Sequence, residues 1–211
     1  MQYGLGLGPV GPWGDPRTIA ELAGLAESSG WDGVFVEDYV FFHDRTSDTY
    51  DPWVTRAAML DESLAALGLL WSGEPVTYWG EHVHLDGVML RPRPVQRPRI
   101  PIVVGGSFER RGPRRRALRW DGCCLYGVTA DNRSRDLTPE DVRTLRAGAG
   151  DRDFMIIIGG RERRPDLEVE TRYVTSLADA GADWWLEYIE TTRTLEHARE
   201  VIRSGPVRAT T

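Results

Sequence analysis

The chain contains no lysine, only two cysteines and no long apolar run. All of its basic charge is therefore carried by arginine, and its net charge of -6 disfavours general binding to nucleic acid. No segment approaches the roughly 18 apolar residues that a membrane-spanning helix needs, so we expect a cytoplasmic protein with no membrane partner. The cysteines, Cys123 and Cys124, are adjacent and would point to opposite faces of a strand. We expect them to be packing residues, without a disulfide or a bound metal.

The composition is that of a globular protein. Apolar residues make up 41% of the 211 positions and charged residues 27%. No linker-like or low-complexity segment divides the chain. We therefore expect a single domain over residues 1–211.

Strand-like and helix-like segments alternate along most of the chain. Each helix-like segment shows helical spacing of apolar residues or a clear start signal, such as Asp15-Pro16 and Thr138-Pro139. This alternation is typical of an α/β fold with a parallel sheet or barrel. Six barrel strands are expected: Tyr3–Val10, Asp32–Asp38, Ile100–Gly106, Gly122–Gly127, Phe154–Gly160 and Ala182–Ile189. The later helices are expected near Gly112–Trp120, after Thr138, at Thr171–Ala180 and at Thr194–Ser204.

The alternation is interrupted in the middle of the chain. Pro52–Ser72 is expected to form one long helix, and Val76–Met89 a small hairpin. Arg91–Pro101 is a proline-rich connector, too stiff for a helix. A complete (β/α) barrel has eight strands, so about two strand–helix units are lacking.

Several segments of the sequence resemble luciferase-like flavin-dependent oxidoreductases. They are YGLGLG with GDPRTIAELAGLAESSGWDGVFVEDY, LDESLAALGLLWSGEPVTYWGEHVHL, RPRPVQRPRIPIVVGGSFERRGPRRRALRWDG and ADAGADWWLEYIE. The resemblance implies a TIM-barrel-like (β/α) barrel of the bacterial luciferase type. In that comparison Met59 runs directly into Leu60, where the family has its third and fourth strands. It also implies FMN or the deazaflavin F420 as cofactor and a small organic molecule as substrate.

A glycine pair ends the expected strand Ile100–Gly106. Gly105, Gly106 and Ser107 would let backbone amides approach a phosphate closely, and arginines follow in the next turn. Cations at a helix start are unfavourable unless an anion is present. The resemblance assigns this strand end to the cofactor phosphate, with Arg111 as our candidate among the arginines. The alternative is a basic helix face exposed to solvent.

The same pattern recurs two strands later. Gly159, Gly160 and Arg161 again combine a glycine pair with a basic residue at a strand end, and Tyr126 ends the intervening strand. Catalytic and binding groups of α/β barrels lie at the carboxyl ends of their strands. We therefore add these four residues to the candidate cofactor site.

Three residues near the second strand are candidates for catalysis. Glu37 and Asp38 end that strand, and His43 follows in an aromatic loop, where an imidazole titrates near neutral pH. The alternatives are a loop-capping role for the carboxylates and an incidental loop histidine. His82 and His84 share one face of the hairpin without a third ligand nearby, and we expect no metal site.

Two functions remain open from the sequence. The first is an FMN- or F420-dependent oxidoreductase or monooxygenase, in which the cofactor carries out the redox chemistry. The second is a redox-inactive barrel remnant, which binds small molecules, acts as a cofactor-free isomerase or lyase, or is a structural partner of a full-length relative. A third possibility is a deletion product without function. Loss of two strands would expose two sheet edges, which predicts a homodimer with the Pro52–Ser72 helix at or near its interface.

Overall fold

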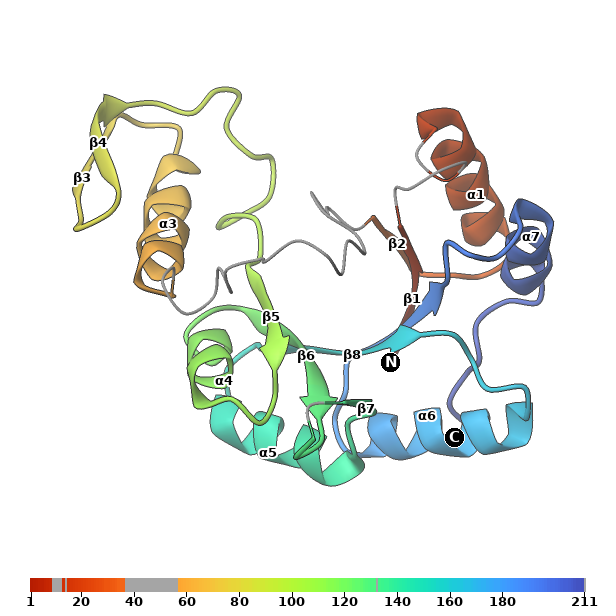
Figure 1. The fold of residues 1–211 in the computed structure, drawn as a ribbon. Coiled ribbons are helices and arrows are strands. Elements are labelled where there is room, and N and C mark those ends of the chain that lie inside the picture. The colour runs from red at the N-terminus through yellow and green to blue at the C-terminus, as the bar shows by residue number, and fades with distance from the viewer. Residues whose placement is uncertain (9–12, 14, 37–56, 132, 211) are drawn as a thin grey trace. The chain divides into compact units, whose positions relative to one another are not determined.

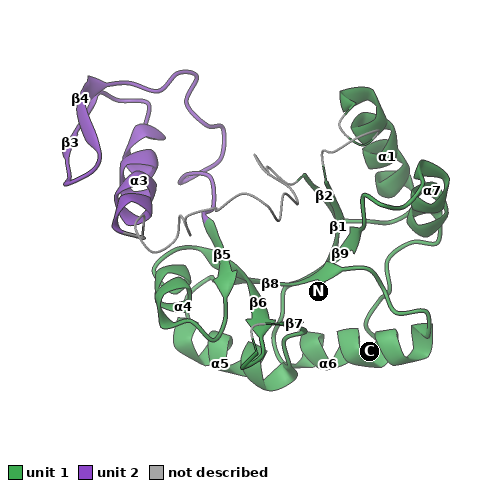
Figure 2. Ribbon diagram, in the orientation of Figure 1, with its two compact units in different colours: residues 1–42, 103–211 green, residues 43–102 purple. Residues whose placement is uncertain are grey.

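The computed structural model describes residues 1–8, 13, 15–36, 57–131 and 133–210. These residues form two compact units, shown in separate colours in Figure 2. Unit 1 comprises residues 1–42 and 103–211, and unit 2 comprises residues 43–102. The expectation that 1–211 is a single domain stays a prediction.

Unit 1 is built on a parallel sheet of six strands in the order β2-β1-β9-β8-β6-β5. A short strand, β7, pairs with β6 in the antiparallel sense. The six strands predicted from the sequence are confirmed, and so is the α/β class. The bounds are β1 Gln2–Leu7, β2 Gly33–Val36, β5 Val103–Ser107, β6 Gly122–Val128, β7 Ser134–Arg135, β8 Met155–Arg161 and β9 Trp184–Ile189.

Helices follow the strands and lie on the convex side of the curved sheet (Figure 1). They are α1 Pro16–Ser28, α4 Arg111–Ala117, α5 Pro139–Ala149, α6 Leu167–Asp179 and α7 Leu195–Arg203. Apolar side chains between sheet and helices make up the core, and they include Leu5, Leu7, Leu22, Ile156, Ile158, Leu177, Trp185 and Ile202. This layering is the strand–helix repeat of a (β/α) barrel.

The barrel is not closed. β1 and β9, from opposite ends of the chain, pair in parallel from Gln2↔Trp184 to Leu7↔Ile189. Among the described residues, however, β2 and β5 have a single neighbouring strand each. These two edges flank the place where two strand–helix units of a complete barrel would stand, as the sequence predicts. Homodimerisation over such edges stays a prediction.

Helix starts follow the expected capping chemistry, with one correction. The Asp15 side chain accepts the Arg17 N–H at 2.9 Å, and Thr138 and Asp141 form a reciprocal capping box. α6, however, begins at Leu167 after the Asp166 cap, four residues before the expected start. Its first turn exposes Leu167 and buries Glu170, which is the reverse of the amphipathic pattern used to find helices.

The capping box of α5 gives a testable stability effect. The Asp141 carboxylate accepts hydrogen bonds from Arg135 at 2.7 Å and from the Thr138 N–H at 2.8 Å. Burial alone would raise the pKa of Asp141, but these hydrogen bonds outweigh it and lower the pKa. We expect Asp141→Asn to reduce the free energy of unfolding by about 1 kcal/mol at neutral pH.

The expected loss depends on pH. A carboxyl group with a lowered folded-state pKa stabilises the fold above its unfolded pKa, and this contribution disappears as the pH falls through the folded value. The free energies of unfolding of wild type and Asp141→Asn, measured in urea, should therefore approach each other as the pH is lowered below about 4. Glu140→Gln, at an exposed neighbouring position, is the matched control. A difference between Asp141→Asn and wild type that persists unchanged at the acidic pH would contradict this account.

Unit 2 contains α3 Ala57–Leu70 and the antiparallel hairpin β3 Val76–Trp79 and β4 His84–Val88. The predicted hairpin is confirmed, and so is the predicted helix over residues 57–70; residues 52–56 lie outside the described part. The Glu62 carboxylate ties helix to hairpin by accepting the N–H groups of residues 81, 82 and 83 at 2.8–2.9 Å. Residues 89–102 form neither helix nor strand, as expected for the proline-rich connector.

Both cysteines of the chain lie on β6. Cys123 is fully buried in β6, Cys124 is half-buried, and no disulfide joins them. Burial, the largest influence, raises the pKa of Cys123 to about 12, so its thiol stays protonated. Cys123 thus packs in the core, as expected. No helix within the described ranges is long and apolar enough to cross a bilayer.

Candidate functional site

The predicted cofactor residues lie at the carboxyl ends of three neighbouring strands. Gly105–Ser107 end β5, Tyr126 lies near the end of β6, and Gly159–Arg161 end β8. Ser107 is directly paired with Tyr126. β6 pairs with both β5 and β8, so the structure brings these three segments to one edge of the sheet.

The glycine pair of β5 serves two different purposes. A Cβ at Gly106, whose φ is 139°, would lie 2.6 Å from the Pro113 Cβ, so this glycine permits close packing of α4. Gly105 is exposed, and a Cβ there would meet only the Cys124 carbonyl oxygen, at 3.6 Å. Gly105 is thus the member of the pair whose backbone is open to a ligand.

Ser107 is buried and forms part of a cluster that holds a negative charge. Its hydroxyl donates to Glu109 Oε2 at 3.1 Å, and the Val128 N–H donates to the same oxygen at 2.8 Å. Arg135 donates to Glu109 Oε1 at 2.5 Å. Burial opposes the charge, yet these hydrogen bonds lower the pKa of Glu109. The β5–β6 end therefore stabilises an anion, here a carboxylate of the protein itself.

The arginines after β5 have different environments. Arg110 and Arg111 are exposed, and Arg110, the N-cap of α4, makes no side-chain capping bond. Arg114 stacks on the Phe108 ring, with its guanidinium carbon 5.3 Å from the ring centroid, and Arg116 is largely buried. The alternative interpretation, a basic helix face exposed to solvent, therefore applies to only part of the helix. Arg111 is exposed in the first turn of α4, the helix that follows β5.

A pocket of about 410 Å³ opens at the ends of β6 and β8. Its walls include Tyr126, which is half-exposed, and both glycines of the second pair. The φ angles are 119° at Gly159 and 87° at Gly160, a region that favours glycine. The remaining lining residues are Leu125, Ser134, Arg135, Asp136, Leu137, Ile158, Arg161 and Tyr173.

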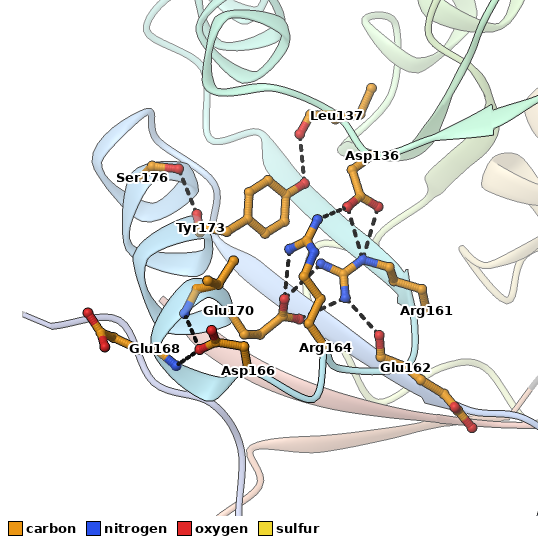
Figure 3. A network of polar contacts seen from close by, with 11 residues as sticks. Asp136, Leu137, Arg161, Glu162, Arg164, Asp166, Glu168, Glu170, Tyr173 and Ser176 are labelled. Atoms are coloured by element: carbon orange, nitrogen blue, oxygen red, sulfur yellow. Dashed lines mark hydrogen bonds and ion pairs between the residues drawn. The ribbon is translucent and has the colours of Figure 1, made fainter.

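Arg161 belongs to a four-membered charge network at the wall of this pocket (Figure 3). Arg161 donates to Asp136 at 3.0 Å and to Glu170 at 2.8 Å, and Arg164 donates to the same two carboxylates at 2.5 and 2.7 Å. Glu170 is completely buried. Most N–H groups of Arg161 thus have protein partners, and its predicted part in binding a cofactor phosphate stays a prediction.

Tyr173 covers this network from α6. Its ring lies 4.7 Å from the Arg164 guanidinium carbon, and its hydroxyl donates to the Leu137 carbonyl at 2.7 Å. Burial is the main cause that raises the pKa of Tyr173, so the phenol remains neutral. Sequence reasoning missed Asp136, Glu170 and Tyr173. The available signal was the run Arg161-Glu162-Arg163-Arg164, which requires nearby carboxylates if its guanidinium groups are not all exposed.

The three candidate catalytic residues lie outside the described part of the chain. Glu37 and Asp38 directly follow β2, and His43 lies in the same undescribed segment. Their roles stay predictions. Within the described ranges, no three histidine, cysteine, aspartate or glutamate side chains are grouped as metal ligands.

Comparison with known proteins identifies relatives of this fold. A family model described as luciferase-like monooxygenase matches residues 38–161. The FMNH(2)-dependent dimethylsulfone monooxygenase of Pseudomonas putida is 25% identical over 182 residues, which cover 82% of this chain and 47% of that protein. The chain thus spans about half the length of this curated relative.

Two solved structures are similar to the fold of this chain. One is the coenzyme F420 dependent tetrahydromethanopterin reductase from Methanopyrus kandleri, with a TM-score of 0.66 and 12% identity. The other is the monooxygenase RslO1 from Streptomyces bottropensis, with a TM-score of 0.60 and 16% identity. Each alignment covers 96% of this chain and 97% of the other. At these identities the likeness concerns the barrel fold alone.

Proposed function

Since the chain belongs to the luciferase-like monooxygenase family, we propose that it is an FMN- or F420-dependent oxidoreductase acting on a small organic substrate. The observation that carries this proposal is the gathering of two glycine-rich strand ends at one edge of the sheet, on either side of Tyr126. The pocket there, about 410 Å³, is within the size range of small-molecule sites.

The residues at this edge suit the phosphate end of such a cofactor. The exposed Gly105 backbone lets a phosphate approach closely, and the Arg111 guanidinium supplies positive charge and several N–H donors. At Gly160 nothing lies within 4 Å of the position that a Cβ would occupy, so the chain is open to a ligand there as well.

The residues at this edge of the sheet would position the cofactor and would not react themselves. A bound flavin or deazaflavin supplies the hydride or oxygen chemistry of this family. Tyr126, exposed at the pocket mouth, would pack against the ring or its side chain, while the neighbouring charge network holds the pocket wall rigid. Glu37, Asp38 and His43 remain our candidates for moving a proton to or from the substrate.

FMN and riboflavin, which differ only by the phosphate, provide the test. We expect FMN to bind more tightly than riboflavin, and Arg111→Glu to weaken FMN binding about tenfold or more, because it removes a charge-assisted hydrogen bond. Isothermal titration or fluorescence quenching measures both affinities. A cofactor present at a hundred times its Kd should also stabilise the fold by about 2.7 kcal/mol.

The controls separate phosphate binding from other effects. Arg111→Glu should leave riboflavin binding unchanged, and Arg172→Glu, the same charge reversal at an exposed site on α6, should leave FMN binding unchanged. Equal affinity of wild type for FMN and riboflavin would contradict the phosphate assignment. Failure of FMN and F420 to bind at all would favour the redox-inactive, small-molecule-binding alternative.

A further inference from the structure

The segment 110–119, which contains α4, is strongly basic although the protein as a whole is acidic. Its sequence is RRGPRRRALR, with six arginines and no carboxylate, whereas the net charge of the chain is -6. α4 directly follows β5, whose end carries Gly105 (Figure 1). The excess positive charge therefore lies next to the strand end that the proposed function assigns to a cofactor phosphate.

The packing of α4 decides which of these arginines face solvent. Pro113 lies against the end of β5, where a Cβ at Gly106 would be 2.6 Å from the Pro113 Cβ, and Ala117 is completely buried. This face of the helix is therefore turned to the sheet. Three arginines of the helix and its N-cap position are exposed, and we call them the arginine patch: Arg110, Arg111 and Arg115.

The arginine patch has no carboxylate partner among the described residues. Glu109 precedes it directly, but the carboxylate of Glu109 is engaged by Arg135 at 2.5 Å. Several exposed arginines elsewhere in unit 1 do have such partners: Arg133 with Asp131 at 2.7 Å, Arg143 with Glu140 at 3.2 Å and Arg172 with Glu168 at 2.7 Å. The patch thus presents three positive charges that no neighbouring carboxylate neutralises.

This arrangement is unfavourable for the helix itself. Arg111 and Arg115 are like charges four positions apart, which repel, and cations at a helix start oppose the helix dipole. No acidic residue stands in the first turn of α4 to offset them. A bound anion would remove this cost, which is the second indication of a ligand.

The number of charges indicates what kind of anion fits. A phosphate monoester carries at most about two negative charges, fewer than the three guanidinium groups of the patch. Arg115 also lies about one helical turn further along α4 than Arg111. The patch therefore suits a ligand that continues beyond its phosphate with further anionic groups.

We propose that the arginine patch binds an anionic cofactor tail and so selects the deazaflavin F420, whose phosphodiester is followed by glutamate residues, over FMN, which ends at its phosphate. The inference rests on the proposed function, because it places the phosphate beside Gly105. From there the tail follows the exposed side of α4, and its carboxylates accept charge-assisted hydrogen bonds from Arg110 and Arg115.

Three deazaflavins with the same ring test this assignment: the riboflavin-like form without phosphate, F420 without glutamate, and F420 with five glutamates. We expect the glutamates to strengthen binding to wild type about tenfold at low ionic strength. This gain should largely disappear at about 1 M salt, where the Debye length is about 3 Å. The fluorescence of the deazaflavin ring measures each Kd.

Double variants localise the gain to the patch. Arg110→Gln with Arg115→Gln should abolish the gain from the glutamates and leave the affinity for the phosphate-free form unchanged, while lysine at both positions should retain most of the gain. Arg143→Gln with Arg172→Gln removes the same charge from exposed positions on α5 and α6 and should preserve the gain in full.

Four outcomes would overturn the proposal: equal affinity of the two F420 forms for wild type, a gain that survives in Arg110→Gln with Arg115→Gln, a gain that is insensitive to salt, or tighter binding of FMN than of F420 with five glutamates. If the glutamate-free form binds and the tail adds nothing, the tail assignment alone is wrong. If neither FMN nor any deazaflavin binds, the proposed function is wrong as well.

Discussion

Replacing Glu170 by leucine is expected to lower the free energy of unfolding by about 3 kcal/mol or more. Glu170 is completely buried in α6 and is the acceptor for both Arg161 and Arg164. Leucine matches the size of the lost side chain but leaves two partly buried guanidinium groups with one remaining carboxylate, that of Asp136 (Figure 3). An uncompensated buried charge is much more costly than a lost surface ion pair.

Urea denaturation followed by circular dichroism measures this loss. The matched control is Glu168→Leu, two positions away on the same helix, where the glutamate is 81% exposed and pairs with Arg172. That control should stay within about 0.5 kcal/mol of wild type. If both variants were equally stable, the network would be a surface feature and would not hold the pocket wall.

Gly159→Ala is expected to lower the free energy of unfolding by about 3 kcal/mol, through overpacking and backbone strain together. Gly159 has a φ of 119°, and a Cβ there would lie 2.1 Å from the Leu186 carbonyl oxygen of β9. The clash is with the backbone of the neighbouring strand, so no side-chain rotation can relieve it. β8 and β9 would have to separate at the pocket.

Gly160→Ala separates the two causes. Gly160 also has a positive φ, of 87°, but no atom lies within 4 Å of the position that a Cβ would occupy there. We expect this variant to lose only the strain energy, about 1–2 kcal/mol. Thermal and urea unfolding of the two variants should therefore differ clearly. Equal losses would mean that the conformation of Gly159, rather than its contact with β9, requires glycine.

The predictions from the sequence that the structure confirms are those that depend on local chemistry. Buried strands such as Met155–Arg161, and caps such as Asp15 and Thr138, follow from local chemistry: apolar runs, turn residues and side chains that accept the first N–H groups. α6 begins earlier than expected because Asp166 caps it and because Glu170, in its first turn, is buried by ion pairs with Arg161 and Arg164 of the segment just before the helix. The helical spacing of apolar residues, on which the prediction relied, does not register a helix turn that is buried by ion pairs.

In the candidate site, too, some features were predictable from the sequence and others were shown only by the tertiary structure. Both glycine pairs and Tyr126 could be assigned from the sequence, since strand ends and their residue types are local features. The sequence could not show that one glycine of the first pair, Gly106, serves helix packing. Nor could it show that Arg161 is paired with Asp136 and Glu170.

The sequence by itself thus determined the alternation of strands and helices, the six strands of a shortened barrel, the family and the edge of the sheet that carries the candidate site. The tertiary structure alone decided which charges meet there. Arg161 and Asp136 are 25 positions apart and become neighbours because β6 and β8 are adjacent in the sheet. Periodicity and capping depend on neighbouring residues, whereas ion pairing and close packing depend on how distant segments are brought together.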